Sequence, residues 1–570
     1  MKKYILLILL IIVSCDSKNK TESKNPLETA VENTEFKITP VFKKVDSGYS
    51  NLQFSNTITE NIETLENLFS FDYFYNGAGV GVEDLNNDGL LDVFFCGNQV
   101  PNRLYLNNGD LKFTDISESS GINIGKNWSN GITFVDINND GYQDIYVSQG
   151  GPKDRNDRKN LLYINNKDLT FTEKAEEYGL ADMGISTQSA FFDYDNDGDL
   201  DCVVMNENEI YGVDPINFYK IVDNNTEVKY FNSSHIYNNE HGKFVDATIT
   251  SGIQNPIYGL GLCISDINKD GWLDIYFTSD YYIPDALYIN QKDGTFSEKI
   301  KSYTQQISYF GMGIDIADIN SDSKEDIFTL DMSSSDHVRA KTLMASMNTK
   351  RFDYLVNTAG FHYQYMFNSL QLNLGNNKYN NIAQLTKTAN TDWSWSVLMS
   401  DFDNDEDNDI YISNGYRKYA LDNDLQKKVF ATQQKFGRNV PIELKKELYE
   451  TMPTEKLQNV LFENEGKLVF NEKADIWGLG DFSYSNGVAQ GDLDNDGDID
   501  LIVNNMDENA FLYKNLTSDN RNGNYLNIKT IGATSEPYCN VEIKYAGKTQ
   551  YAEQKRVRGY MSSQENELHF

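Results

Sequence analysis

The stretch DYDNDGDLD, Asp193–Asp201, places an aspartate at every second position over nine residues. Carboxylates at this spacing repel one another, and no basic residue within the stretch offsets them. A hard divalent cation would turn this repulsion into coordination, because such ions prefer oxygen ligands. For a single copy, a solvated acidic turn is the simpler interpretation. The rest of the chain decides between the two.

The pattern occurs seven times, and we number the copies loops 1 to 7 in chain order. Besides loop 3, they are DLNNDGLLD (Asp84–Asp92), DINNDGYQD (Asp136–Asp144), DINKDGWLD (Asp266–Asp274), DINSDSKED (Asp318–Asp326), DFDNDEDND (Asp401–Asp409) and DLDNDGDID (Asp492–Asp500). Every copy has Asp at positions 1, 5 and 9, and Asp or Asn at position 3. Recurrence at fixed internal spacing excludes chance composition and favours a repeated cation site.

The spacing has a chemical reason. Side-chain oxygens at positions 1, 3 and 5 can point inward when a loop curls around a cation, and glycine at position 6 permits the sharp turn. Position 7 varies freely, as expected when only its backbone carbonyl is a ligand, and Asp at position 9 would close the cage. Ser323 and Glu406 replace the glycine in loops 5 and 6, which argues against full occupancy there. All-oxygen ligation favours Ca²⁺ over transition metals, and Mg²⁺ prefers a smaller octahedral site.

The sequence therefore predicts up to seven Ca²⁺ ions, one per loop. The predicted ligands are, by position, Asp84, Asp136, Asp193, Asp266, Asp318, Asp401 and Asp492 (position 1); Asn86, Asn138, Asp195, Asn268, Asn320, Asp403 and Asp494 (position 3); Asp88, Asp140, Asp197, Asp270, Asp322, Asp405 and Asp496 (position 5); Leu90, Tyr142, Asp199, Trp272, Lys324, Asp407 and Asp498 (position 7); and Asp92, Asp144, Asp201, Asp274, Asp326, Asp409 and Asp500 (position 9).

The flanking residues exclude an EF-hand, which needs a Glu at position 12 and helices on both sides. Strand-forming residues such as DIYV and DCVV follow each loop instead. A glycine stands five residues before five of the loops, and an L-Y-x-N-like strand ending in Asn follows all seven. Four short antiparallel strands in each unit of roughly fifty residues are typical of a propeller blade. The seventh unit lacks its fourth strand, which Val41–Phe54 can supply. We expect an all-β, seven-bladed β-propeller closed in this way.

The glycine, acidic loop and strand pattern resembles the FG-GAP repeats of integrin alpha-subunit propellers, called VCBS-type repeats in bacteria. The resemblance covers residues 36–516 and implies Ca²⁺ in the loop between the first two strands of each blade. Insertions interrupt the units, with helix-prone segments near 333–355 and 416–457. Insertions on one face of a repeat array often form its binding face. Trp393 and Trp395 lie just before loop 6, where we expect them to belong to the core.

The C-terminal residues 520–570 resemble an ASPIC/UnbV domain of the cartilage acidic protein-like family, through the N-x-L start, RGYMSSQ (Arg558–Gln564) and the terminal LHF. The resemblance implies a small β-rich domain that continues beyond LHF, so we expect it to be truncated here. The usual Gly-Ala before its middle strand is Cys539-Asn540 in this chain.

The first residues have the pattern of an export signal. Lys2 and Lys3 precede an apolar run, and Ile-Val-Ser-Cys, ending at Cys15, resembles a bacterial lipoprotein cleavage site. We expect residues 1–15 to be the signal, Cys15 to carry the lipid and residues 16–35 to form a flexible tether. This implies a bacterial envelope protein anchored by lipid in the outer membrane.

Composition narrows the function. The formal net charge of −35 argues against nucleic acid as a partner, because phosphate binding needs basic surface. The chain shows no CxxC pair, no HExxH and no Ser-His-Asp pattern. The leading hypothesis is a non-enzymatic, calcium-stabilised module for binding or adhesion that takes a glycan or protein ligand on a propeller face. The alternatives are a polysaccharide lyase or hydrolase and a scaffold subunit of an outer-membrane uptake complex.

Overall fold

The structure is a computed structural model that describes residues 40–122, 125, 128–342, 348–437, 439–520, 523–530 and 538–570. Pro40–Phe570 form one compact unit. The predicted export signal, the lipidation residue Cys15 and the tether lie outside the described residues. Within the described ranges, no helix combines the length and apolar character that crossing a bilayer requires.

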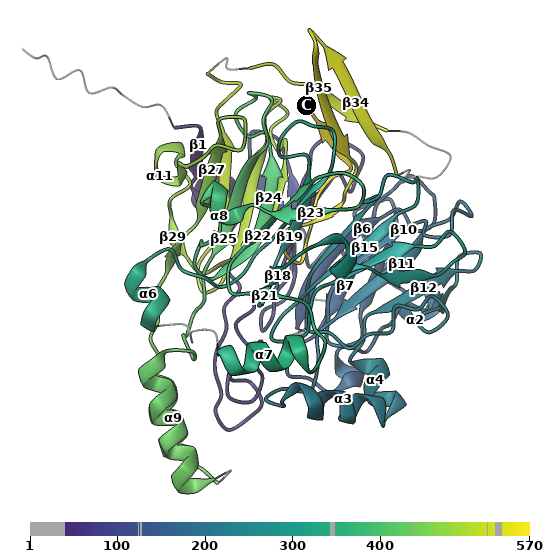
Figure 1. The fold of residues 1–570 in the computed structure, drawn as a ribbon. Coiled ribbons are helices and arrows are strands. Elements are labelled where there is room, and N and C mark those ends of the chain that lie inside the picture. Colours follow the sequence, from purple (N-terminus) through teal and green to yellow (C-terminus); the bar gives the residue numbers. More distant parts are fainter. Residues whose placement is uncertain are drawn as a thin grey trace, which may run out of the picture. The chain divides into compact units, whose positions relative to one another are not determined.

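Seven blades of four antiparallel strands each make up the propeller, and the sheet of blade 1 is extended to six strands by the C-terminal segment (Figure 1). In chain order the blades are β2 (Val80–Glu83), β3 (Asp92–Phe95), β4 (Arg103–Asn107) and β5 (Phe113–Asp115); β6 (Ser129–Val135), β7 (Asp144–Gln149), β8 (Leu161–Asn165) and β9 (Phe171–Glu173); β10 (Ser186–Phe192), β11 (Asp201–Asn206), β12 (His235–Asn239) and β13 (Phe244–Asp246); β14 (Gly259–Ser265), β15 (Asp274–Ser279), β16 (Ala286–Asn290) and β17 (Phe296–Glu298); β19 (Ile314–Ala317), β20 (Asp326–Thr329), β22 (Ser369–Asn373) and β23 (Tyr379–Asn381); β24 (Ser394–Ser400), β25 (Asp409–Asn414), β27 (Val460–Asn464) and β28 (Phe470–Glu472); and β30 (Ser485–Gly491), β31 (Asp500–Asn505) and β32 (Phe511–Asn515) with β1 (Phe42–Val45). The predicted seven-bladed propeller is confirmed.

The ring is closed within blade 7. Strand β1 pairs with β32 in antiparallel register from Phe42 opposite Asn515 to Val45 opposite Leu512. The N-terminal strand is therefore the fourth strand of a sheet whose other three come from the end of the propeller sequence. This closure joins the two ends of the propeller sequence within one sheet.

Inner strands of neighbouring blades approach closely, which explains the glycine before the loops. A Cβ atom on Gly131 of β6 would lie 2.2 Å from the carbonyl oxygen of Thr187 in blade 3. A Cβ atom on Gly313, just before β19, would lie 2.1 Å from the carbonyl oxygen of Trp395 in blade 6. No side chain fits at these positions, so glycine sets the spacing of the blades.

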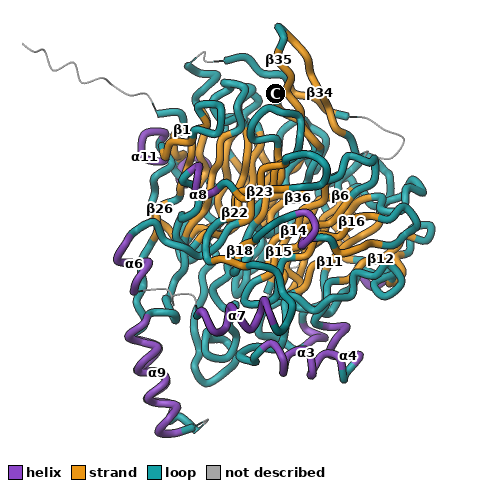
Figure 2. Tube along the Cα trace, in the orientation of Figure 1, coloured by secondary structure: helices purple, strands orange, loops and turns teal. Residues whose placement is uncertain are grey.

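The insertions are helical and follow the second strand of blades 3, 5 and 6. They contain α3 (Pro215–Asp223) and α4 (Thr226–Phe231), α6 (His337–Thr342) and α7 (Thr349–Asn357), and α9 (Asn423–Phe436) and α10 (Ile442–Glu450). The acidic loops join the first and second strands, so they lie at the opposite ends of the sheets. We call the two ends the insertion face and the loop face. Figure 2 shows α3, α4, α7 and α9 gathered beyond one end of the strands.

The C-terminal segment is β-rich and joins the propeller. Strand β33 (Asn527–Lys529) pairs with β38 (Glu567–His569), and β34 (Asn540–Tyr545) forms a hairpin with β35 (Lys548–Glu553) on the loop-face side. Strands β36 (Val557–Arg558) and β37 (Ser562–Ser563) extend the sheet of blade 1, since Ser563 pairs in parallel with Gly81 of β2.

Residues 556–564 occupy the centre of the ring. The Met561 carbonyl accepts a hydrogen bond of 3.2 Å from the Ile132 amide of blade 2, and the Gly559 amide donates over 2.8 Å to the Ile314 carbonyl of blade 5. The guanidinium of Arg558 holds the buried Asp315 carboxylate with two bonds of 2.8 and 2.6 Å. A segment that contacts the inner strands of blades on different sides of the ring must lie where those strands face one another. The C-terminal segment therefore plugs the central channel.

Candidate functional sites

All seven acidic loops adopt the same backbone arrangement. In loop 3 the Asp193 carboxylate accepts the amide of Asp197 at 3.1 Å and the amide of Gly198 at 3.0 Å. The equivalent pairs of bonds occur in the other six loops. Position 1 thus fixes the turn through its carboxylate, whatever else it binds.

Position 6 has a left-handed backbone in every loop. Gly198 has a φ of 98°, whereas Ser323 and Glu406 have φ values of 63° and 84°. Non-glycine residues in this region carry a strain of roughly 1–2 kcal/mol. The amides of Ser323 and Glu406 still donate to position 1, at 2.6 and 2.8 Å. Loops 5 and 6 therefore keep the shared conformation despite the departures from glycine.

Position 3 supplies oxygen atoms that have no partner among the described residues. The Oδ1 atoms of Asp195, Asn268, Asp403 and Asp494 are buried and accept no hydrogen bond. In loops 3, 6 and 7, oxygens from three carboxylates also lie within 4.8 Å of one another. Burying an unpaired carboxylate oxygen is costly, and bringing like charges together adds to that cost. A cation among these oxygens would remove both penalties, so the donor set fits Ca²⁺.

Loop 5 places an amide between two of its carboxylates. The side-chain nitrogen of Asn320 donates to Oδ1 of Asp318 at 3.1 Å and to Oδ1 of Asp322 at 3.2 Å. Asn320 would have to turn by half a rotation to offer its oxygen to a cation.

Loop 7 already contains a cationic side chain. The ammonium of Lys514 lies 2.5 Å from Asp494 and 2.8 Å from Asp496. Burial lowers the pKa of Lys514, but the two carboxylates outweigh this effect and hold the pKa well above its ordinary value. Lys514 therefore competes with a divalent cation for two of the predicted ligands of loop 7.

The position 9 aspartates brace the blades. In loop 3, the carboxylate of the buried Asp201 accepts hydrogen bonds from the backbone N–H of Tyr194 at 3.2 Å and from the backbone N–H of Asn239 at 2.8 Å. Asp201 thus connects its loop to the third strand. The other six loops repeat both bonds. Burial raises the pKa of Asp201 to about 8 and that of Asp92 to about 7. Sequence reasoning assigned these residues a ligand role and missed this structural one.

The asparagine that ends each third strand links neighbouring blades. The side-chain amide of Asn165 donates to the Leu85 carbonyl in loop 1 at 2.9 Å and to the Gln143 carbonyl in its own loop 2 at 3.1 Å. Four others reach position 2 of the preceding loop in the same way: Asn107 to Leu493, Asn290 to Tyr194, Asn464 to Ile319 and Asn515 to Phe402. The repeated asparagine was visible in the sequence, but its partner in another blade was not.

A pocket of about 600 Å³ opens on the insertion face. Segments from far apart in the chain form it: residues 68–76 before β2, the ends of β15 and β25, α7 and the start of β24. Its aromatic walls are Tyr73, Tyr281, Tyr309, Phe310, Phe352, Trp393, Trp395 and Tyr416. Trp393 and Trp395 are 7% and 1% exposed, so the core prediction is confirmed, yet both also line this pocket.

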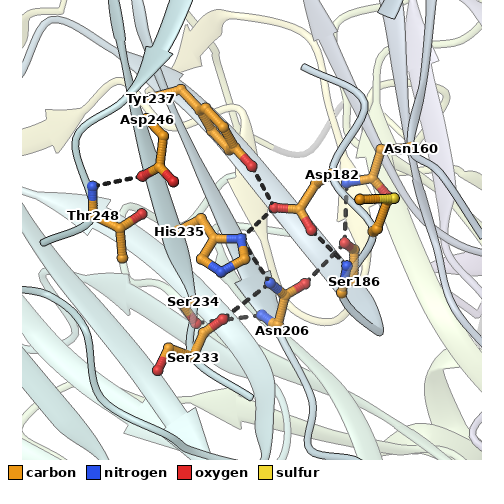
Figure 3. Close-up of polar contacts among 12 residues, drawn as sticks. Asn160, Asp182, Ser186, Asn206, Ser233, Ser234, His235, Tyr237, Asp246 and Thr248 are labelled. Atoms are coloured by element: carbon orange, nitrogen blue, oxygen red, sulfur yellow. Dashed lines mark hydrogen bonds and ion pairs between the residues drawn. The ribbon is translucent and has the colours of Figure 1, made fainter. Parts of the chain in front are cut away.

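Blade 3 contains a buried His–Asp pair that resembles part of a catalytic triad (Figure 3). Nδ1 of His235 lies 2.5 Å from the Asp182 carboxylate, which also accepts the Tyr237 hydroxyl at 2.7 Å. Nε2 of His235, the nitrogen that would take a proton from a nucleophile, lies 3.0 Å from the Tyr230 carbonyl. Both ring nitrogens therefore donate to oxygens, and the pair is an internal ion pair that stabilises the blade.

Comparisons of this chain with known protein families and proteins agree with the fold. Residues 84–147, 153–204 and 266–329 match the FG-GAP-like repeat family. Cartilage acidic protein 1 of Xenopus tropicalis is 29% identical over 159 residues, which are 28% of this chain and 23% of that protein. The match thus spans less than a quarter of that relative. The chain is a seven-bladed β-propeller, and these three segments of it are similar to FG-GAP-like repeats.

Two solved structures are distantly similar. An Agrocybe aegerita lectin that recognises non-reducing terminal N-acetylglucosamine has a TM-score of 0.37 and 15% identity, covering 71% of this chain and 82% of its own. The exotype rhamnogalacturonan lyase YesX has a TM-score of 0.37 and 10% identity, covering 78% and 72%. Similarity at this level indicates neither a ligand nor a reaction for this chain.

Proposed function

We propose that the protein is a non-enzymatic, calcium-stabilised binding module of the bacterial envelope, held at the outer membrane by lipid on Cys15. It takes a glycan or protein ligand in the pocket on its insertion face. The single observation that carries the proposal is that pocket, whose aromatic walls come from separate segments of the chain, with Phe352 of α7 supplied by an insertion. Aromatic side chains provide a large contact area and stack on flat apolar surfaces of ligands.

Bound calcium would stabilise the loop face, at the opposite ends of the sheets from the pocket. The unpartnered position 3 oxygens and the clustered carboxylates support this assignment. Bound Ca²⁺ would neutralise the acidic loops and cross-link their oxygens. Each loop also accepts bonds from its own third strand, and five asparagines reach the preceding loop. Ordering one loop therefore supports its neighbour, which suits a structural role for the metal.

A glycan array and a pull-down from outer membranes test the proposed function. The calcium-loaded protein is compared with Phe310→Ala, which removes one wall of the pocket, and with Phe482→Ala, a matched change at an exposed side chain outside it. We expect a ligand that binds the wild type and Phe482→Ala but not Phe310→Ala. A ligand retained equally by both variants would place binding elsewhere.

The second candidate is a polysaccharide lyase or hydrolase. The pocket contains two carboxylates, Asp72 and Asp280, and burial raises the pKa of Asp280 to about 7. Such a pKa suits a general acid. Turnover of an acidic polysaccharide that is lost in Asp280→Asn would favour this candidate over the binding module.

A further inference from the structure

The pocket on the insertion face has an acidic side. Asp280 is buried and accepts the Tyr73 hydroxyl at 3.0 Å and the Tyr281 amide at 2.6 Å. Asp72 is half-buried and accepts the Tyr281 hydroxyl at 2.8 Å. Burial is the largest cause that raises the pKa of Asp280, and the charges of Asp331 and Asp72 raise it further. Asp331 is fully buried in the next blade. Two carboxyl groups thus lie at one wall, and a positive group beside them would favour their charged forms.

The neutral walls suit a positive group. Tyrosine, tryptophan and phenylalanine rings line most of the pocket, and the faces of such rings attract cations, most strongly when water is excluded. Among the described residues, the lining contains no lysine. Its one arginine, Arg351, is exposed, and its guanidinium lies 5.4 Å from the ring centre of Tyr282. The carboxylates of the pocket therefore outnumber its cations.

A second observation points to a polar ligand. Trp393 lines the pocket and is 7% exposed, and its indole N–H has no hydrogen-bond partner among the described residues. Its ring is stacked on Tyr416 at 3.8 Å, which fixes its orientation. A buried donor without a partner is costly, so a ligand oxygen that accepts this N–H would be favoured.

We propose that the pocket binds an organic ammonium group, carried by a ligand that also offers a hydrogen-bond acceptor. The ammonium group would lie between the aromatic faces and the carboxylates of Asp72 and Asp280, and the acceptor would take the N–H of Trp393. Amino sugars and lysine side chains with their adjacent carbonyl both have this chemistry. The inference rests on the proposed binding function and specifies the ligand of that site.

Two matched probe pairs test it by calorimetric titration of the calcium-loaded chain. Glucosamine is compared with glucose, and Nα-acetyl-lysinamide with Nα-acetyl-norleucinamide. In at least one pair, we expect the charged member to bind about tenfold or more tightly than its neutral counterpart. The pair that responds identifies the source of the ammonium group.

Variants locate the binding. Asp280→Asn and Asp72→Asn preserve side-chain shape and remove one charge each, and each should weaken the charged probe about tenfold. Asp353→Asn removes an exposed charge from α7, outside the pocket lining, and should leave binding unchanged. Melting curves confirm folding, and the half-buried Asp72 provides a second variant if Asp280→Asn is unstable.

Equal affinities within both pairs, no binding of either charged probe at millimolar concentration, or binding unaffected by both pocket variants would overturn the inference. A neutral or anionic array ligand that is lost in Phe310→Ala would overturn it too, while leaving the proposed function intact. Absence of any ligand sensitive to Phe310→Ala would count against the proposed function itself.

Discussion

Removing the side chain of Asn290 should weaken the contact between blades 3 and 4. This residue is 2% exposed. Its side-chain amide donates to the Tyr194 carbonyl of loop 3 at 2.7 Å and to the Leu273 carbonyl of its own loop at 3.2 Å. Its side-chain oxygen accepts the Lys292 amide at 2.9 Å. Leaving a buried carbonyl without its donor costs roughly 1–3 kcal/mol. We therefore expect Asn290→Ala to lower the free energy of unfolding by about 2–5 kcal/mol.

Asn239 is the matched control. It occupies the same place in blade 3 and donates to the Leu200 carbonyl of its own loop at 3.0 Å, but no bond from its amide to the preceding loop occurs among the described residues. Asn239→Ala should thus cost about 1–3 kcal/mol less than Asn290→Ala. Urea unfolding in calcium, followed by fluorescence, measures both. Equal losses would refute the claim that these asparagines couple the blades.

Three further changes test other parts of the structure. Burial lowers the pKa of His235, but the Asp182 carboxylate outweighs burial and raises that pKa. The His235–Asp182 ion pair therefore contributes its full stability below about pH 6.5, and this contribution falls as the pH rises through the folded-state pKa of His235. His235→Gln should therefore cost more stability near pH 6 than near pH 9 in urea titrations; a loss independent of pH would contradict the ion pair. Arg558→Ala removes the counter-ion of the buried Asp315, whose carboxylate keeps hydrogen bonds from the Ile316 and Met399 backbone amides. This should cost about 3–5 kcal/mol and expose the C-terminal segment to limited proteolysis, whereas unchanged digestion would argue against the plug. Asp197→Ala should remove one calcium ion and leave the ring folded, because each blade mainly contacts its neighbours; loss of all circular dichroism signal would show otherwise.

The sequence predicts the architecture because the same local residue pattern recurs in every blade. Seven acidic loops at fixed spacing, each followed by strand formers, defined the blades, and Val41–Phe54 was recognisable as the missing strand that became β1. Ser323 and Glu406 were recognised as departures, but their retained left-handed backbone depends on bonds to position 1 that only the structure shows.

The sequence does not predict the contacts between residues that are far apart in the chain. Nothing local marks residues 556–564 as the plug of the channel, since their partners lie in blades hundreds of residues away. The pocket is assembled in the same way: Tyr73, Tyr281 and Trp393 belong to separate segments and meet only after the ring has closed. Periodicity predicts repeated elements, whereas a site built once from unrelated segments leaves no periodic signal.

Calcium content tests the account most directly. Protein dialysed against calcium-containing buffer and then rinsed is analysed for bound metal, and its melting temperature is measured with and without a chelator. We expect several calcium ions per chain, at most one for each of the seven loops, with loop 7 weakened by Lys514, and a marked fall in melting temperature on chelation. Protein without bound calcium whose melting curve ignores the chelator would contradict the proposal that the acidic loops hold this metal.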